Sequence, residues 1–217
     1  ALSYDEEVGC TGAPPMIATM QEVVPKGSAA LIGEPSGMKI ITGHKGGTGY
    51  AVHVKGFEVH SSLLPEGVSA VMEGARLIQW VNDKNTEIMA ETPGPIAARF
   101  RPPFTTLHVG QIQGGTADNI TAADCRFSVE MRCVPGEDPD ARAGEFRDAA
   151  TRLDESLKAK RPEAGVHLRK FFDVAVYPQG TSDIVALMVL EHQVAAQTAL
   201  TRADYGMREA LHRQSRE

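Results

Sequence analysis

The order of hydrophobic and polar positions in the middle of the chain predicts four strands and two helices. The third strand gives the clearest pattern, because Phe127, Val129 and Met131 alternate with polar residues. The second helix has a defined start, since Asp138 can cap it and Pro139 fits its first position. The predicted strands cover residues 50–55, 106–112, 125–133 and 166–176, and the first helix covers residues 67–82.

Each of these helices has one apolar face, and the Pro/Gly-rich residues 92–103 predict a loop. In the first helix, helical spacing places four residues on this face: Val68, Val71, Ala75 and Ile78. In the second, the predicted buried stripe is Phe146, Ala149, Ala150, Leu153 and Leu157. The resulting order, βαββαβ, is the ferredoxin-like arrangement, which belongs to the α/β class. One layer of helices on an antiparallel sheet leaves the other sheet face and the edges in need of cover.

Three carboxylates near the N-terminus form the most informative chemical pattern. Glu6 and Glu7 follow an apolar run at residues 1–4, which predicts the end of a strand, where α/β enzymes place their chemistry. Glu34 lies in a Gly-Glu-Pro turn after a second predicted strand at residues 29–32. Carboxylates brought together in this way suit a divalent metal and a general base that activates water. The same run also fits a solvated acidic turn.

Outside the middle region, few other elements are predicted. A helix around residues 15–22 joins the two N-terminal strands. Towards the C-terminus another helix is predicted, with Ser182 as its cap. Its apolar face consists of Ile184, Leu187 and Met188. These patterns divide the chain into residues 1–41, 42–178 and 179–217.

Composition and charge exclude several classes of protein. The 217 residues are 42% hydrophobic and 23% charged, as in an ordinary globular protein. The net charge of −6 and the lack of any Lys/Arg-rich run argue against a nucleic-acid or anionic-membrane partner. No apolar run has the length of a transmembrane helix, and we expect no signal peptide. Cys10, Cys125 and Cys133 are widely spaced and predict reduced, mostly buried thiols in a cytoplasmic protein.

Several motifs occur together in one fixed order along the chain. They are Glu6-Glu7, Gly33-Glu34-Pro35, His44-Lys45-Gly46, residues 56–62 with 67–70, residues 110–120 and residues 130–132. In this order they resemble the dinuclear-zinc peptidase family M20, and are similar to its acetylornithine deacetylase branch. The resemblance implies a remnant of a zinc-peptidase catalytic domain. It also implies an inserted ferredoxin-like domain at residues 42–178, which the family uses as a lid and for dimerisation.

The resemblance also implies roles for the N-terminal carboxylates. Glu6 matches the general base, which takes a proton from water and delivers it to the leaving amine. Glu7 and Glu34 match terminal metal ligands, one on each of two zinc ions, with cobalt as an alternative metal. The family's His-x-Asp motif, its bridging Asp and its C-terminal metal-binding His have no match, since none of the seven histidines is followed two residues later by Asp. We therefore expect an incomplete form of the enzyme with little activity on its own.

Three residues of the middle region match further roles in the family. His60 matches the His that reaches the partner subunit's active site and polarises the scissile carbonyl; by its local context it also fits a strand end or a cap. Asn119 matches a substrate-binding Asn, and it also fits a turn with unusual backbone angles. Where the family has a Pro soon afterwards, this chain has Thr121-Ala122-Ala123. Arg132 matches a residue that holds the substrate α-carboxylate, and it also fits a cross-strand pair with an acid.

The function that the resemblance implies is hydrolysis of N2-acetyl-ornithine to ornithine and acetate, in arginine biosynthesis. The implied partners are a small N-acyl amino acid and a second copy of the chain, paired through the lid domain. Alternatives within the family are a succinyl-diaminopimelate desuccinylase, an aminoacylase and a carboxypeptidase. An alternative from another class is a non-catalytic dimerisation module.

Overall fold

The structure is a computed structural model that describes residues 2, 4, 10–25, 30–32, 43–174 and 185–187, with only the backbone for 30–32 and 185–187. The chain divides into two units. The first comprises residues 1–14 and 44–178, and the second comprises residues 15–43 and 179–217. The three-part division of the sequence at residues 41 and 178 stays a prediction.

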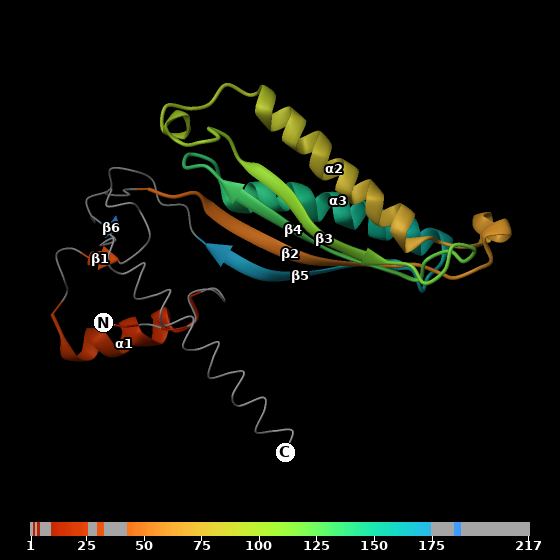
Figure 1. Cartoon of the computed structure of the whole chain (residues 1–217), viewed down its shortest axis with the longest axis horizontal. Coiled ribbons are helices and arrows are strands. Elements are labelled where there is room, and N and C mark those ends of the chain that lie inside the picture. The colour runs from red at the N-terminus through yellow and green to blue at the C-terminus, as the bar shows by residue number, and fades with distance from the viewer. Residues whose placement is uncertain are drawn as a thin grey trace, which may run out of the picture. The chain divides into compact units, whose positions relative to one another are not determined.

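A four-stranded antiparallel sheet forms the body of the first unit (Figure 1). Its strands are β2 (Gly46–Lys55), β3 (Thr106–Gly114), β4 (Asp124–Cys133) and β5 (Gly165–Val174), in the spatial order β3-β4-β2-β5. Helices α2 (Ala70–Ala90) and α3 (Pro139–Lys160) cover one face of this sheet. The opposite face is called the outer face below. The chain order is βαββαβ, which confirms the predicted ferredoxin-like arrangement.

Strand β2 is central in the sheet and pairs along its length with both neighbours. With β4, the register runs from Gly46 opposite Cys133 to Lys55 opposite Asp124. With β5, it ends where Lys55 lies opposite Gly165. The two ends of β2 therefore define the two ends of the sheet.

The hydrophobic core lies between the sheet and the two helices. Phe127, Val129 and Met131 of β4 face this core and are at most 5% exposed, as their alternation predicts. Helix α3 contributes the predicted stripe, all five members of which are buried. Phe146 is its largest member and is fully buried, with its ring centroid 6.1 Å from that of Tyr50. The helix–sheet interface is thus the one that the sequence predicts for α3 and β4.

The buried face of α2 differs from the prediction. Ser69 is the N-cap of this helix, so Val68 lies in the extended segment before it. The buried positions are Ala70, Gly74, Leu77, Val81 and Ile88, while Val71 and Ala75 are exposed and Ile78 is half-buried. A helical spacing counted from Val68 starts outside the helix. It also misses Gly74, where an added Cβ would lie 2.9 Å from the sulfur of Cys125, and glycine carries no hydrophobic signal.

The second unit contains a short parallel pair of strands. Strand β1 (Ala30–Ile32) pairs with β6 (Val185–Leu187), and Ala30 lies opposite Val185. This confirms the strand predicted at residues 29–32, but the helix predicted to follow Ser182 is wrong at the residues of β6. A short apolar run fits either a strand or a helix. Pairing with a strand that is distant in sequence decides between the two, and the local spacing of apolar residues does not reveal that pairing.

Three short elements complete the described chain. Helix α1 (Ala13–Val23) confirms the helix predicted around residues 15–22. Turns of 3-10 helix occur at η2 (Ser61–Glu66) and at η3 (Ala97–Arg99), the latter inside the predicted loop at residues 92–103.

The strand predicted at residues 1–4 is wrong at its two described members, because Leu2 and Tyr4 belong to no strand. The Tyr4 backbone approaches Gly12 instead. A Cβ added to Gly12 would lie 2.5 Å from the Tyr4 carbonyl oxygen.

The cysteines behave as the sequence predicts. Cys125 and Cys133 are buried free thiols, and Cys10 is exposed. Burial raises the pKa of the Cys125 thiol and raises that of Cys133 to about 11, so both stay protonated at neutral pH. Among the helices of the described residues, none combines the length and the apolar character needed to cross a membrane.

Replacing Phe146 by Ala tests the core between α3 and the sheet. Because the side chain is fully buried, Phe146→Ala should lower the free energy of unfolding by about 3–5 kcal/mol. The matched control is Phe171→Ala on β5, where the side chain is 49% exposed and the loss should be about 1 kcal/mol. Urea unfolding followed by circular dichroism measures both. Equal losses for the two variants would contradict this description of the core.

Candidate functional site

The described candidate residues lie at two opposite ends of the sheet. His60 and Asn119 belong to connections that meet where β2 ends and β4 begins. Arg132 lies near the end of β4, opposite Gly47 at the start of β2. Eight residues of β4 separate Asp124 from Arg132, which is about 27 Å along an extended strand. Within one chain the structure therefore brings His60 and Asn119 together and keeps Arg132 apart from them.

Backbone pairing joins the segments that carry His60 and Asn119. His60 forms an isolated antiparallel bridge with Ile120. The Ser61 N–H donates a 2.8 Å hydrogen bond to the Asn119 carbonyl oxygen. Both His60 and Asn119 are exposed, so their side chains are accessible at the surface of this unit.

The hydrogen bonds of His60 define which ring nitrogen is free. Its Nδ1 accepts from the Ser62 N–H at 3.3 Å and lies 2.9 Å from the Ser62 Oγ. This contact caps η2, as one interpretation of the sequence predicts. A neutral imidazole that accepts at Nδ1 carries its proton on Nε2. His60 thus presents an N–H donor to a ligand.

A buried threonine holds residues 57–66, called the His60 segment below, against the turn that follows Asn119. The Thr121 Oγ1 accepts from the Val59 N–H at 2.8 Å and donates to the Phe57 carbonyl oxygen at 2.8 Å. The Thr121 N–H also donates to the Val59 carbonyl oxygen at 2.9 Å. Nearby, Gly56 lies so close to other backbone that an added Cβ would be 2.4 Å from the Ala122 carbonyl oxygen. The backbone around His60 is therefore fixed by hydrogen bonds and close packing.

The arginine that caps the C-terminus of α3 holds the two ends of the same segment. The Nε and Nη2 of Arg161 both donate to the Glu66 carbonyl oxygen, at 2.8 and 2.6 Å. Its guanidinium carbon also lies 4.5 Å from the centroid of the Phe57 ring. Sequence reasoning missed both Arg161 and Thr121. Thr121 belongs to Thr121-Ala122-Ala123, the stretch that stands in place of the family's Pro, and this departure was the available signal, whereas Arg161 is far from the motif in sequence.

Arg132 has neighbours at its own end of the sheet. It forms an ion pair with Glu130 of the same strand, and its guanidinium carbon lies 5.0 Å from the centroid of the Phe172 ring. The prediction of a cross-strand pair with an acid is wrong, because Gly47 and Thr106 lie opposite Arg132 on the neighbouring strands. The side chain is half-exposed and can reach a ligand.

The predicted metal and general-base residues Glu6, Glu7 and Glu34 lie outside the described residues. Within the part of the chain that the structure describes, no group of three or more His, Cys, Asp or Glu side chains could hold a metal ion. The structure thus places His60, Asn119 and Arg132, and the metal site stays a prediction.

Comparison with known families decides where the chain belongs. The family model described as "Peptidase dimerisation domain" of M20 matches residues 42–157. The chain belongs to the M20 peptidase family. The matched region contains β2, β3, β4, α2 and most of α3, so it includes both His60 and Arg132.

Relatives and solved structures agree with this membership. The M20 chain is 36% identical over 139 residues to an acetylornithine deacetylase from Myxococcus xanthus, covering 64% of the chain and 35% of that relative. It is 30% identical over 168 residues to an acetylornithine deacetylase from Salmonella arizonae, covering 75% of the chain and 41% of that relative. The chain thus spans between a third and a half of the length of these curated relatives.

Two solved structures show the same fold at lower sequence identity. The aminopeptidase PepT from Bacillus cereus has a TM-score of 0.56 at 16% identity, covering 87% of this chain and 49% of that one. An amidase of the hydantoinase/carbamoylase family from Burkholderia multivorans has a TM-score of 0.51 at 18% identity, covering 63% of this chain and 30% of that one. These likenesses concern the fold alone.

Removing the Arg161 side chain tests its hold on the His60 segment. In Arg161→Ala, the amide protons of Ser61 and Leu63 should exchange with solvent about tenfold faster, because two charge-assisted hydrogen bonds to Glu66 are lost. In Arg161→Lys these exchange rates should lie between those of the wild type and those of Arg161→Ala, since lysine can keep a single hydrogen bond. Arg152→Ala, an exposed arginine on the same helix, is the matched control. Hydrogen exchange measures all three, and unchanged rates at Ser61 and Leu63 would refute the assignment.

Proposed function

We propose that the protein carrying this chain is a metal-dependent, homodimeric amidohydrolase of the cytoplasm that converts N2-acetyl-ornithine to ornithine and acetate. The relatives named acetylornithine deacetylase support this choice of substrate. The observation that carries the proposal is the His60 segment. It is held by Thr121 and Arg161 and presents an imidazole N–H at the surface.

The proposed roles follow from the chemistry of each side chain. Glu6 takes a proton from the attacking water and delivers it to the leaving amine. The His60 Nε2–H donates to the carbonyl oxygen as negative charge develops on it. Asn119 and Arg132 bind the substrate, and the Arg132 guanidinium holds its α-carboxylate. Glu7 and Glu34 are the proposed metal ligands, as the resemblance to the family implies.

The connectivity of the sheet supports a dimer in which two chains complete each site. The chain enters the sheet at Gly46 and leaves it at Val174, and Gly47 lies opposite both Val174 and Arg132. His60 lies at the other end, about 27 Å away along β4. Because His60 and Arg132 lie far apart within one chain, a second copy of the chain is the proposed source of the His60 that acts together with Arg132.

The second candidate function is a non-catalytic dimerisation module. It is favoured by the family match, which covers the dimerisation domain and is carried by a complete βαββαβ unit. Under this alternative, Glu6 and Glu7 are an acidic turn, and substitutions there leave every measured property unchanged.

Three substitutions in the full-length, metal-loaded protein test the proposed reaction. Glu6→Gln should abolish turnover of N2-acetyl-ornithine and keep the metal, because the amide fills the same space but cannot accept a proton. Glu7→Ala should lose metal and activity together, because it deletes a ligand. His60→Ala should lower kcat about 100- to 1000-fold at unchanged metal content, as expected for the loss of one oxyanion donor.

The control is His108→Ala, which removes another exposed histidine from the same domain. Kinetics and elemental metal analysis on the same preparations separate the roles. Near-normal turnover of Glu6→Gln would contradict the general-base assignment. A wild-type protein that binds no metal and hydrolyses no N-acyl amino acid would favour the dimerisation module.

A further inference from the structure

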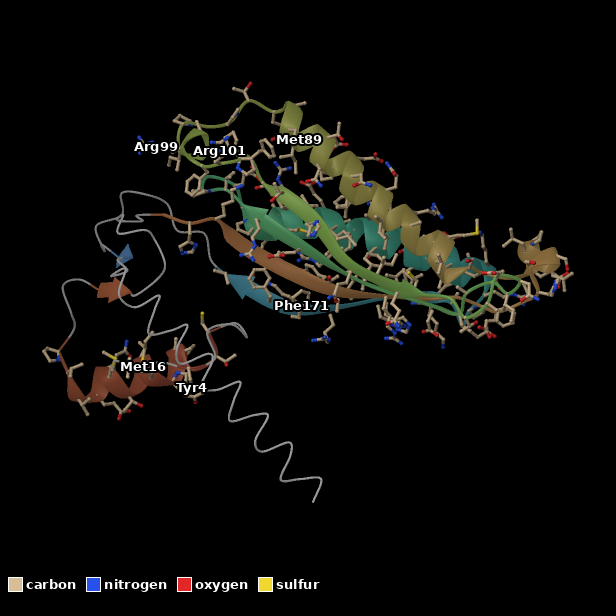
Figure 2. The ribbon with its side chains drawn as sticks, in the orientation of Figure 1. Tyr4, Met16, Met89, Arg99, Arg101 and Phe171 are labelled. Atoms are coloured by element: carbon tan, nitrogen blue, oxygen red, sulfur yellow. The ribbon has the colours of Figure 1, made fainter. Side chains whose placement is uncertain are left out.

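The outer face of the sheet carries a hollow of about 1000 Å³ to which all four strands contribute. Side chains of β2 alternate, so Val52 is buried under the helices while Ala51 and His53 face the outer side. Figure 2 shows the side chains on both sides of the sheet, with Phe171 of β5 on the side away from α2. Ala51 and Ser128 are small residues, and they leave room above the middle of the sheet.

Strand register places a row of nitrogen donors across this hollow. Arg126 of β4 lies opposite His53 of β2, and His53 lies opposite His167 of β5. On the other side of the row, Gln113 of β3 lies opposite Arg126. Directly opposed residues on neighbouring strands have their Cβ atoms about 5 Å apart. The rings of His53 and His167 are 6.0 Å apart between centroids.

A second row adds another cation beside the first. Arg169 of β5 lies opposite Ala51, which in turn lies opposite Ser128 of β4. Arg169 is exposed and makes no hydrogen bond or ion pair with any other described residue. Its guanidinium is therefore available to a ligand in the hollow.

The charges around the hollow are unbalanced. None of the described residues that line it is Asp or Glu. Asp124 lies beside it, where it accepts from His53 Nε2 at 2.5 Å and lies 3.4 Å from the Arg126 guanidinium. The two arginines thus outnumber the acids that line the hollow, although the chain as a whole has a net charge of −6.

We propose that this hollow binds a small, doubly charged oxyanion, such as a phosphate ester or a dicarboxylate. The planar guanidinium groups of Arg126 and Arg169 suit bidentate contacts to its oxygens, and His167 and Gln113 add N–H donors. A long nucleic acid does not fit, because the hollow holds only two arginines and the chain as a whole has a net charge of −6.

This proposal does not depend on the proposed hydrolase activity. Arg132, the residue proposed for the substrate carboxylate, lies six residues from Arg126 along β4, which is about 20 Å. None of the residues in the two rows belongs to the set assigned to the reaction. The ligand would therefore be bound in addition to the N-acyl amino acid.

The experiment is an NMR titration of the full chain with inorganic phosphate and, separately, with succinate, each up to about 10 mM. The proposal predicts saturable shifts of the amide signals of residues 53, 126, 167 and 169 for at least one of the two anions. Phosphate alone indicates a phosphate ester as the natural ligand, and succinate indicates a dicarboxylate. Weakening of about tenfold or more is expected in both Arg169→Gln and Arg126→Gln, as each removes a charge-assisted contact.

The matched control is Arg152→Gln, which removes an exposed arginine from α3 on the helical side of the domain and should bind as the wild type does. If Arg126→Gln unfolds, Arg169→Gln alone decides, because Arg169 has no partner among the described residues to lose. Binding of neither anion would overturn the proposal. So would equal affinity in Arg169→Gln and the wild type.

Discussion

The pairing of β2 with both β4 and β5 is the constraint on which the rest of the structure depends. Ten residues of β2 are in register with β4, from Gly46 to Lys55. This register sets one end of the sheet at Arg132 and the other at the segments that carry His60 and Asn119. It also lines up the basic residues across the middle of the outer face. A slip of one residue would turn every side chain of β2 to the opposite face and expose its buried side chains. Burial of these side chains therefore fixes the register, and with it the two ends of the sheet and the row of basic residues.

The second constraint is local and acts on the His60 segment. The role proposed for the exposed His60 side chain needs a backbone that does not move, and here the support comes from two residues outside the segment. Thr121 ties it to the turn after Asn119, and Arg161 holds both its ends from the C-terminus of α3. This arrangement keeps the His60 Nδ1 bonded within its own segment and leaves the Nε2–H for a ligand.

The sequence predicted the parts of the fold that depend on near neighbours along the chain. The alternation in β4 and the stripe on α3 are local patterns, and the structure confirms both. Predictions were wrong where a distant contact decided the outcome. The strand β6 forms because it pairs with β1, and α2 buries Gly74 because β4 comes close to it. Neither cause is visible in a window of a few residues.

The candidate site was predictable to a similar extent. Ordered motifs indicated His60, Asn119 and Arg132, but their spacing in sequence gave no sign that Arg132 lies at the far end of the sheet. That separation follows from strand length and register, which only the folded chain reveals. The carboxylates Glu6, Glu7 and Glu34 lie outside the described residues, and their roles stay a prediction.

The central claim is that His60 from one subunit completes the site of the other, and a mixed dimer tests it most directly. One full-length subunit carries His60→Ala and the other carries Glu6→Gln, and different affinity tags allow the heterodimer to be isolated. Each parent homodimer should be inactive. If His60 acts across the dimer, the heterodimer has one intact site of two and should recover about half the wild-type rate. If His60 acts within its own chain, neither site is intact, and a heterodimer as inactive as its parents would contradict the account.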